Sequence, residues 1–206
     1  MGCGASSAKY DKKIVPVPDD DIIDDNVADR DDGTGRLQSA CTEVRVFWDV
    51  ENMMPPTDQI KHVKNMLCEK VQEVKPGAKV TIVALMDTGE PSLQGQKPEL
   101  TAAGVDVQCT RFNPMKEKEA SDKAIIMHSL LWLHDNKGND VAVMFVTADT
   151  DFTVLINKIR GYNIDVFLVT RMTDSARDLR EAATQPVVDW QTLLRQAGPG
   201  GRAGGR

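Results

Sequence analysis

The fold is decided by the segment Val44-Arg45-Val46-Phe47-Trp48-Asp49-Val50-Glu51-Asn52, which has the pattern of a buried β-strand that runs directly into an acid and an amide. Four of its first five residues are apolar, and this run predicts a strand over residues 44–50. Asp49 stands where the apolar run ends. A carboxylate there is costly to remove from water unless a cation or a hydrogen-bond donor meets it, so Asp49 is the first candidate site residue.

The chain that follows alternates between strand and helix patterns. Strands are predicted over residues 44–50, 79–86, 105–112, 141–148, 164–170 and 186–190, and helices over residues 57–74, 93–103, 121–136, 151–160, 175–183 and 191–196. Strands separated by helices of this length indicate parallel pairing, because a parallel neighbour needs a long crossover. The strands are apolar on both faces, as in a sheet covered on both sides. We therefore expect an α/β fold: a three-layer, open, mainly parallel sheet with helices on both faces.

Several acids are predicted to meet at one edge of this sheet. In an open parallel sheet, ligands bind beyond the carboxyl ends of the strands, where the strand order reverses. Asp49 and Asp149 each close a strand at that edge, Asp151 opens the next helix, and Asp122 lies in the first turn of the helix after strand 105–112. The alternative for Asp122, Asp149 and Asp151 is a structural one, since acids also favour helix N-termini.

Clustered carboxylates repel one another, and a bound divalent cation removes that repulsion. Ligands that are all oxygen favour Mg²⁺ or Mn²⁺ over zinc. Such a cation equips a site for phosphodiester hydrolysis. Phosphates of a substrate would then be held by basic residues near the same edge, for which Arg111, Lys123 and Arg171 are candidates; ordinary exposed surface residues are the competing interpretation for each of them.

Three short motifs in this order resemble the NYN domain of the PIN-like nuclease superfamily, and most closely its eukaryotic limkain b1 branch. They are Phe47-Trp48-Asp49-Val50-Glu51-Asn52, Ala120-Ser121-Asp122-Lys123 and Val146-Thr147-Ala148-Asp149-Thr150-Asp151-Phe152. The resemblance implies a Rossmann-like, metal-dependent ribonuclease of single-stranded RNA. It also implies that Asp49, Asp122 and Asp149 are metal-site acids, that Asn52 orients a water or phosphate, and that Asp151 is an auxiliary acid.

The two ends of the chain differ from its middle, so we expect a tether at residues 1–41, the NYN domain at 42–196 and a flexible Gly/Arg tail at 197–206. The tether begins Met1-Gly2-Cys3-Gly4-Ala5-Ser6-Ser7, which fits the acylation pattern, with Gly2 to take myristate and Cys3 to take palmitate. Two acyl chains would anchor the protein stably to the cytoplasmic face of a membrane. The rest of the tether is rich in aspartate and predicted to be disordered.

Composition narrows the possible functions. The net charge is −6, of which residues 1–35 carry −5, so the remaining chain is nearly neutral and shows no broad basic surface for duplex DNA. No apolar run is long enough to span a membrane. The four cysteines have no zinc spacing, which favours a reducing, intracellular compartment with Cys68 and Cys109 as small core residues.

Two other functions remain open at this stage. One is a catalytically inactive domain that binds RNA or a protein partner. The other is a phosphatase of the haloacid dehalogenase type, since Asp49-Val50-Glu51 is loosely similar to a strand-end Asp-x-Asp. Dinucleotide binding is disfavoured, because the first strand is followed by Asp-Val-Glu-Asn where a Gly-rich turn would be required.

Overall fold

The computed structural model of the chain describes residues 42–87, 91–110, 120–173 and 176–197. The predictions for the acidic tether, the acylation residues Gly2 and Cys3, Arg111 and the Gly/Arg tail all lie outside these residues.

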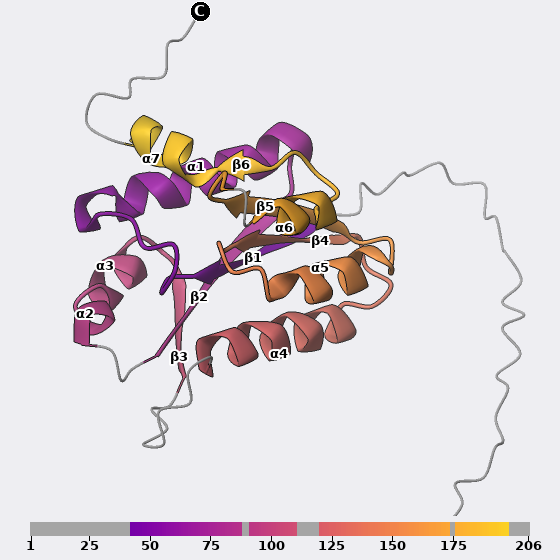
Figure 1. The fold of residues 1–206 in the computed structure, drawn as a ribbon, viewed down its shortest axis with the longest axis horizontal. Coiled ribbons are helices and arrows are strands. Elements are labelled where there is room, and N and C mark those ends of the chain that lie inside the picture. The colour runs from indigo at the N-terminus through magenta and orange to yellow at the C-terminus, as the bar shows by residue number, and fades with distance from the viewer. Residues whose placement is uncertain (1–41, 88–90, 111–119, 174–175, 198–206) are drawn as a thin grey trace, which may run out of the picture. The chain divides into compact units, whose positions relative to one another are not determined.

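The described residues form an open sheet of six parallel strands (Figure 1). The strands are β1 (Glu43–Asp49), β2 (Lys79–Asp87), β3 (Asp106–Thr110), β4 (Val141–Val146), β5 (Asp165–Thr170) and β6 (Val188–Asp189). Their order is β3-β2-β1-β4-β5-β6, and every neighbouring pair is parallel. This order is that of a Rossmann-like sheet, so the predicted α/β fold class is confirmed.

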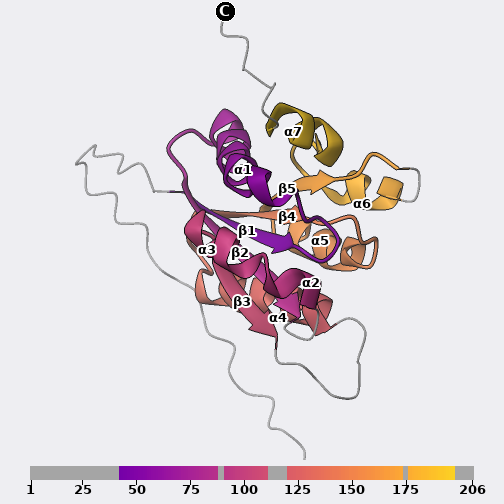
Figure 2. The same ribbon diagram turned by 90° about the vertical axis from the view of Figure 1, so that its left-hand side faces the viewer.

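Helices cover both faces of the sheet. They are a 3-10 turn η1 (Thr57–Gln59), α1 (Ile60–Val74), α2 (Pro91–Gln94), α3 (Lys97–Ala102), α4 (Ala120–Asp135), α5 (Phe152–Arg160), α6 (Arg177–Ala182) and α7 (Trp190–Ala197). The helices α1 and α7 lie side by side in both views (Figures 1 and 2), and Figure 1 shows α4 and α5 on the opposite side of the sheet. None of the described helices is long and apolar enough to cross a bilayer.

The side chains of β1 explain why both faces must be covered. Val44, Val46 and Trp48 pack into the cluster that contains the buried residues of α1 and α7. Phe47 points to the other face, where its ring stacks on Phe145 at 5.8 Å between centroids. A shift of β1 by one residue would exchange these two sets, so packing on both faces fixes the register that brings Asp49 to the end of the strand.

The largest differences between the predicted and observed elements concern one helix and one strand. The helix expected over residues 93–103 is divided into α2 and α3, because Pro98 lies in the first turn of α3 and cannot donate a hydrogen bond within a continuous helix. The strand expected over residues 186–190 is the two-residue β6. It stops there because the Asp189 carboxylate accepts the N–H groups of Gln191 and Thr192 and so caps α7.

The two cysteines in the described residues are free and partly buried, and both pack against the core. The expectation that Cys68 and Cys109 are small core residues is confirmed.

Candidate active site

The order of the strands reverses between β1 and β4, so the carboxyl ends of these two strands form a topological switch point. From β1 the chain continues outward through β2 and β3 on one side, and returns to β4 on the other before continuing to β5 and β6. The helices that leave β1 and β4 therefore diverge to opposite faces, and in open sheets of this kind ligands bind beyond the carboxyl ends of two such strands. Asp49 is the last residue of β1, and Thr147 and Asp149 follow β4, so Asp49 and Asp149 lie at the ends of two neighbouring strands at this edge.

Asp49 is the buried centre of the site, with 1% of its surface exposed. Its Oδ2 accepts hydrogen bonds from Asn52 Nδ2 and from Thr147 Oγ1, both at 2.8 Å. Its Oδ1 accepts the backbone N–H of Asn52 at 3.3 Å. Hydrogen bonds therefore orient both carboxylate oxygens. Oδ1 is held by Asn52 in the loop after β1, and Oδ2 is held both by Asn52 and by Thr147 at the end of β4.

Burial raises the pKa of Asp49 above the ordinary aspartate value of 3.8, and it is the largest influence on that group. Hydrogen bonds from Asn52 and Thr147 act in the opposite direction, and the negative charge of Asp149 raises the pKa further. The hydrogen bonds to Asp49 therefore offset only part of the cost of burying its negative charge. A bound cation is the kind of partner that would favour the ionised form.

The loop after β1 is a single closed turn that presents Asn52 to Asp49. Met53 N donates to the Asp49 carbonyl at 3.0 Å, and Trp48 Nε1 donates to the Met53 carbonyl at 2.9 Å. The Trp48 ring itself is fixed edge-on against Trp190 of α7. Arg171, which follows β5, donates from Nη2 to the Asn52 carbonyl at 2.8 Å. The guanidinium of Arg171 thus lies at the predicted edge, and it contacts the loop.

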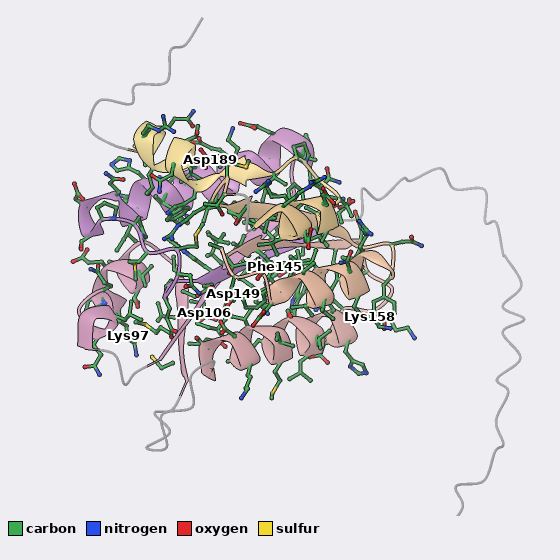
Figure 3. All side chains as sticks on the ribbon, in the orientation of Figure 1. Lys97, Asp106, Phe145, Asp149, Lys158 and Asp189 are labelled. Carbon is green, nitrogen blue, oxygen red and sulfur yellow. The ribbon has the colours of Figure 1, made fainter. Side chains whose placement is uncertain are left out.

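Asp149 lies between Thr147 and the start of α5. Figure 3 labels it, with its side chain, at the end of the sheet where β4 finishes. Its backbone N–H donates to Thr147 Oγ1 at 3.1 Å, and its Oδ1 accepts the N–H of Asp151 at 2.9 Å. The structural alternative therefore applies in part to Asp149, which accepts an N–H at the helix start. Asp151 makes no side-chain capping bond to α5 and is exposed.

The first turn of α4 brings Asp122 towards the same loop. Ser121, which is buried, donates from Oγ to Glu51 Oε2 at 2.8 Å. This bond attaches the start of α4 to the residue directly before Asn52. Asp122, the next residue, is half-buried, and Lys123 is exposed.

Two acids at this edge did not enter the predicted site. Glu51 is predicted only as a loop residue, although an acid two residues after Asp49 and directly before Asn52 is a usable signal. Asp87 is the last residue of β2, the neighbour of β1, so its backbone lies at the same edge. The predicted strand stopped at Met86; an apolar run that ends in an acid, as for Asp49 and Asp149, would have identified Asp87.

The oxygen-rich chemistry of these residues fits a hard divalent cation. Among the described residues, no group of three or more His, Cys, Asp or Glu side chains is arranged to hold a metal ion. Magnesium, however, is usually bound through one or two carboxylates, with waters and substrate phosphates completing its shell. Asp49 and Asp149 are two such carboxylates at this edge, and the charge of Asp149 acts on Asp49; their role as metal ligands stays a prediction. Asp122 as a third ligand stays a prediction.

A parallel Rossmann-like sheet with acids at its switch point is what the predicted PIN-like, nuclease-type domain requires. A family model described as the NYN domain matches residues 43–190, and the protein belongs to the NYN domain family. The family resemblance proposed from the three sequence motifs is thereby confirmed.

Comparison with individual proteins adds evidence on the fold. No curated protein matches the chain. Among solved structures, the chain is similar to the crystal structure of a protein of unknown function from Vibrio parahaemolyticus, with a TM-score of 0.53 and 17% sequence identity. The similarity covers 73% of this chain and 93% of the Vibrio chain, and at this level of identity it bears on the fold alone.

The bond from Thr147 to Asp49 can be tested by replacing the hydroxyl with a methyl group of similar shape. In Thr147→Val, Asp49 loses a donor and the Asp149 N–H loses its acceptor, so we expect a loss of about 1–3 kcal/mol in the free energy of unfolding at neutral pH, measured by urea denaturation. The lost bond favours the ionised carboxylate, so the pKa of Asp49 should rise further in the variant. The loss should therefore be smallest at acidic pH, below the raised pKa of Asp49, where this carboxyl group is protonated in both folded proteins, and should grow as the pH rises through that pKa.

Thr170→Val is the matched control. Thr170 is also fully buried at the end of a strand, and its Oγ1 has no hydrogen-bond partner among the described residues, so its replacement should be neutral or stabilising. Equal losses for the two variants, or a Thr147→Val loss that does not change with pH, would contradict the assigned bond.

Proposed function

We propose that this NYN domain is a metal-dependent ribonuclease that hydrolyses phosphodiester bonds of single-stranded RNA. The observation that carries the proposal is the buried Asp49 carboxylate, which has a raised pKa and lies beside Asp149 at the switch point of a nuclease-type fold. A carboxylate that is incompletely compensated in this position is suited to bind a cation, and it is the residue on which the other contacts of the site converge.

Asp49 and Asp149 would hold Mg²⁺ or Mn²⁺, with Asp122 as the proposed third acid. When bound, the cation supplies Lewis acidity to an attacking water and to the phosphate. The protein's own contribution is orientation. Asn52 and Thr147 fix the two oxygens of Asp49, so the carboxylate need not rearrange when a cation and a phosphate arrive.

The remaining predicted residues would act on the RNA. Asn52 lies in an exposed position from which its amide can also meet a water or a phosphate oxygen. Asp151, exposed at the start of α5, would be the auxiliary acid. Lys123, Arg171 and Arg111 would contact RNA phosphates; the bond from Arg171 to Asn52 leaves further N–H groups of its guanidinium for that purpose.

Family membership favours the nuclease over a phosphatase of the haloacid dehalogenase type. It does not separate an active nuclease from a domain that binds RNA or a protein partner without turnover. The hydrogen bonds that orient both oxygens of the buried Asp49 carboxylate favour the active form, because preorganised polar groups are what a catalytic site requires.

We also propose that Gly2 carries myristate and Cys3 palmitate, and that the domain works at the cytoplasmic face of a membrane. The support is the sequence Met1-Gly2-Cys3-Gly4-Ala5-Ser6-Ser7. The nearly neutral charge of residues 36–206 offers little electrostatic attraction to anionic lipids, so membrane binding would depend on the acyl chains.

The nuclease can be tested with an end-labelled single-stranded RNA incubated with the full-length protein and Mg²⁺, Mn²⁺ or a chelator. We expect cleavage that requires the metal, and a loss of about a hundredfold or more in Asp49→Asn and Asp149→Asn. Asp135→Asn is the matched control, because Asp135 is exposed at the end of α4 and far along the helix from its first turn. Cleavage by Asp149→Asn at the wild-type rate would contradict the assignment.

The same experiment separates the competing functions. Retained RNA affinity without cleavage at any metal concentration would establish the binding-only domain. Hydrolysis of a small phosphomonoester in the absence of RNA cleavage would establish the phosphatase instead.

The anchor can be tested by membrane fractionation of cells that express Gly2→Ala. We expect the variant to move to the soluble fraction, because removal of the acceptor glycine prevents myristoylation, and a single remaining signal is insufficient for stable binding. Gly4→Ala, which leaves the acceptor intact, should remain with the membranes. Continued membrane association of Gly2→Ala would show that acylation at this terminus is not the anchor.

A further inference from the structure

We propose that Arg171 is a positioning residue for the Asp49 site, acting through Asn52. The inference rests on the proposed function in one respect, namely that Asp49 is the residue that binds the cation. It adds a role for Arg171 that is distinct from a contact with RNA phosphate.

The hydrogen bonds form a continuous chain from β5 to β1. Arg171 Nη2 donates to the Asn52 carbonyl at 2.8 Å. The same Asn52 donates from Nδ2 and from its backbone N–H to the two oxygens of Asp49, at 2.8 and 3.3 Å. Any movement of the Asn52 backbone would therefore reach both oxygens of the carboxylate at once.

The path of this connection crosses the candidate site. β5 and β1 are not neighbours, because β4 lies between them. Since adjacent strands are about 4.8 Å apart, Arg171 must reach over the end of β4 to meet the β1 loop. It thereby connects the two halves of the sheet at the switch point between β1 and β4.

The other side of the loop is already fixed by backbone contacts. Met53 N bonds to the Asp49 carbonyl and Trp48 Nε1 to the Met53 carbonyl. These bonds restrain the end of the turn, but they do not involve the Asn52 carbonyl. Arg171 supplies the restraint at that group, and a guanidinium is well suited to it because it is always charged and its donors have a fixed geometry.

Positioning and simple electrostatics predict opposite effects on metal affinity. Removal of a nearby positive charge would by itself tighten the binding of a divalent cation. Loss of the restraint on Asn52 would weaken it, because groups that orient a metal ligand typically contribute about 10–100-fold to affinity. Arg171 is one residue further from the ligand, so we expect Mn²⁺ to bind about three- to tenfold more weakly to Arg171→Met.

The experiment measures Mn²⁺ affinity of the full chain by calorimetry, without RNA. Arg171→Lys, which keeps a charged donor, should recover part of the affinity. Arg177→Met is the control, because Arg177 is an exposed arginine at the start of α6 that pairs with Glu181 and has no bond to the loop. In an Asn52→Ala background, Arg171→Met should have little further effect. Unchanged or tighter Mn²⁺ binding to Arg171→Met, or independent effects of the two substitutions, would overturn the proposal.

A second measurement needs no metal. Amide hydrogen exchange at Asn52 and Met53, whose N–H groups bond to Asp49, should be faster in Arg171→Met, while the Thr153 amide in α5 should be unchanged. Unaltered exchange at both loop amides would overturn the positioning role. If wild-type protein bound no Mn²⁺, the metal site would fail, yet this exchange experiment would still decide whether Arg171 holds the loop.

Where RNA is cleaved, the kinetics give a third criterion. A positioning residue should lower kcat more than it raises KM, whereas an arginine that only contacts phosphate should raise KM and reduce the salt dependence of binding. An effect confined to KM would overturn the proposal.

Discussion

The structure depends on a carboxylate that is buried at the end of a central strand. Asp49 is 1% exposed, and the free energy needed to desolvate it is offset in part by donors from its own loop and from the neighbouring strand. Those donors are in place because packing on both faces of β1 fixes its register. Residual desolvation and the charge of Asp149 keep its pKa raised. The burial of Asp49 therefore affects both the stability of the fold and the chemistry of the candidate site, and such coupling is common at functional sites.

The fold could be predicted from the sequence because its signals are local and repeated. Apolar runs such as Val141–Val146, separated by helices, permit few arrangements other than a parallel sheet with two covered faces. Boundaries were less certain where a single residue decides the outcome, as with Pro98 between α2 and α3 or the Asp189 cap at α7. In each case a hydrogen bond or its loss ends an element that the apolar pattern alone would continue.

The candidate site was predictable in outline and not in its contacts. The strand-end positions of Asp49 and Asp149 follow from topology, since parallel strands bring their carboxyl ends to one edge. The bond from Thr147 to Asp49 joins residues 98 positions apart, and that from Arg171 to Asn52 joins residues 119 apart. Neither has a sequence signature, because each depends on the order of β1, β4 and β5 in the sheet. Asp87 was missed for a simpler reason, a strand end placed one residue too early.

If the incompletely compensated charge of Asp49 is what equips this domain for metal-dependent chemistry, a cation must stabilise the folded protein through that residue. The most direct measurement is thermal unfolding of wild-type protein and Asp49→Asn, each with and without Mn²⁺. A ligand that binds the native state alone raises the free energy of unfolding by about 2.7 kcal/mol at a hundred times its Kd. We predict that Mn²⁺ raises the Tm of the wild type and leaves that of Asp49→Asn unchanged; an equal shift in both proteins, or none in the wild type, would contradict this assignment.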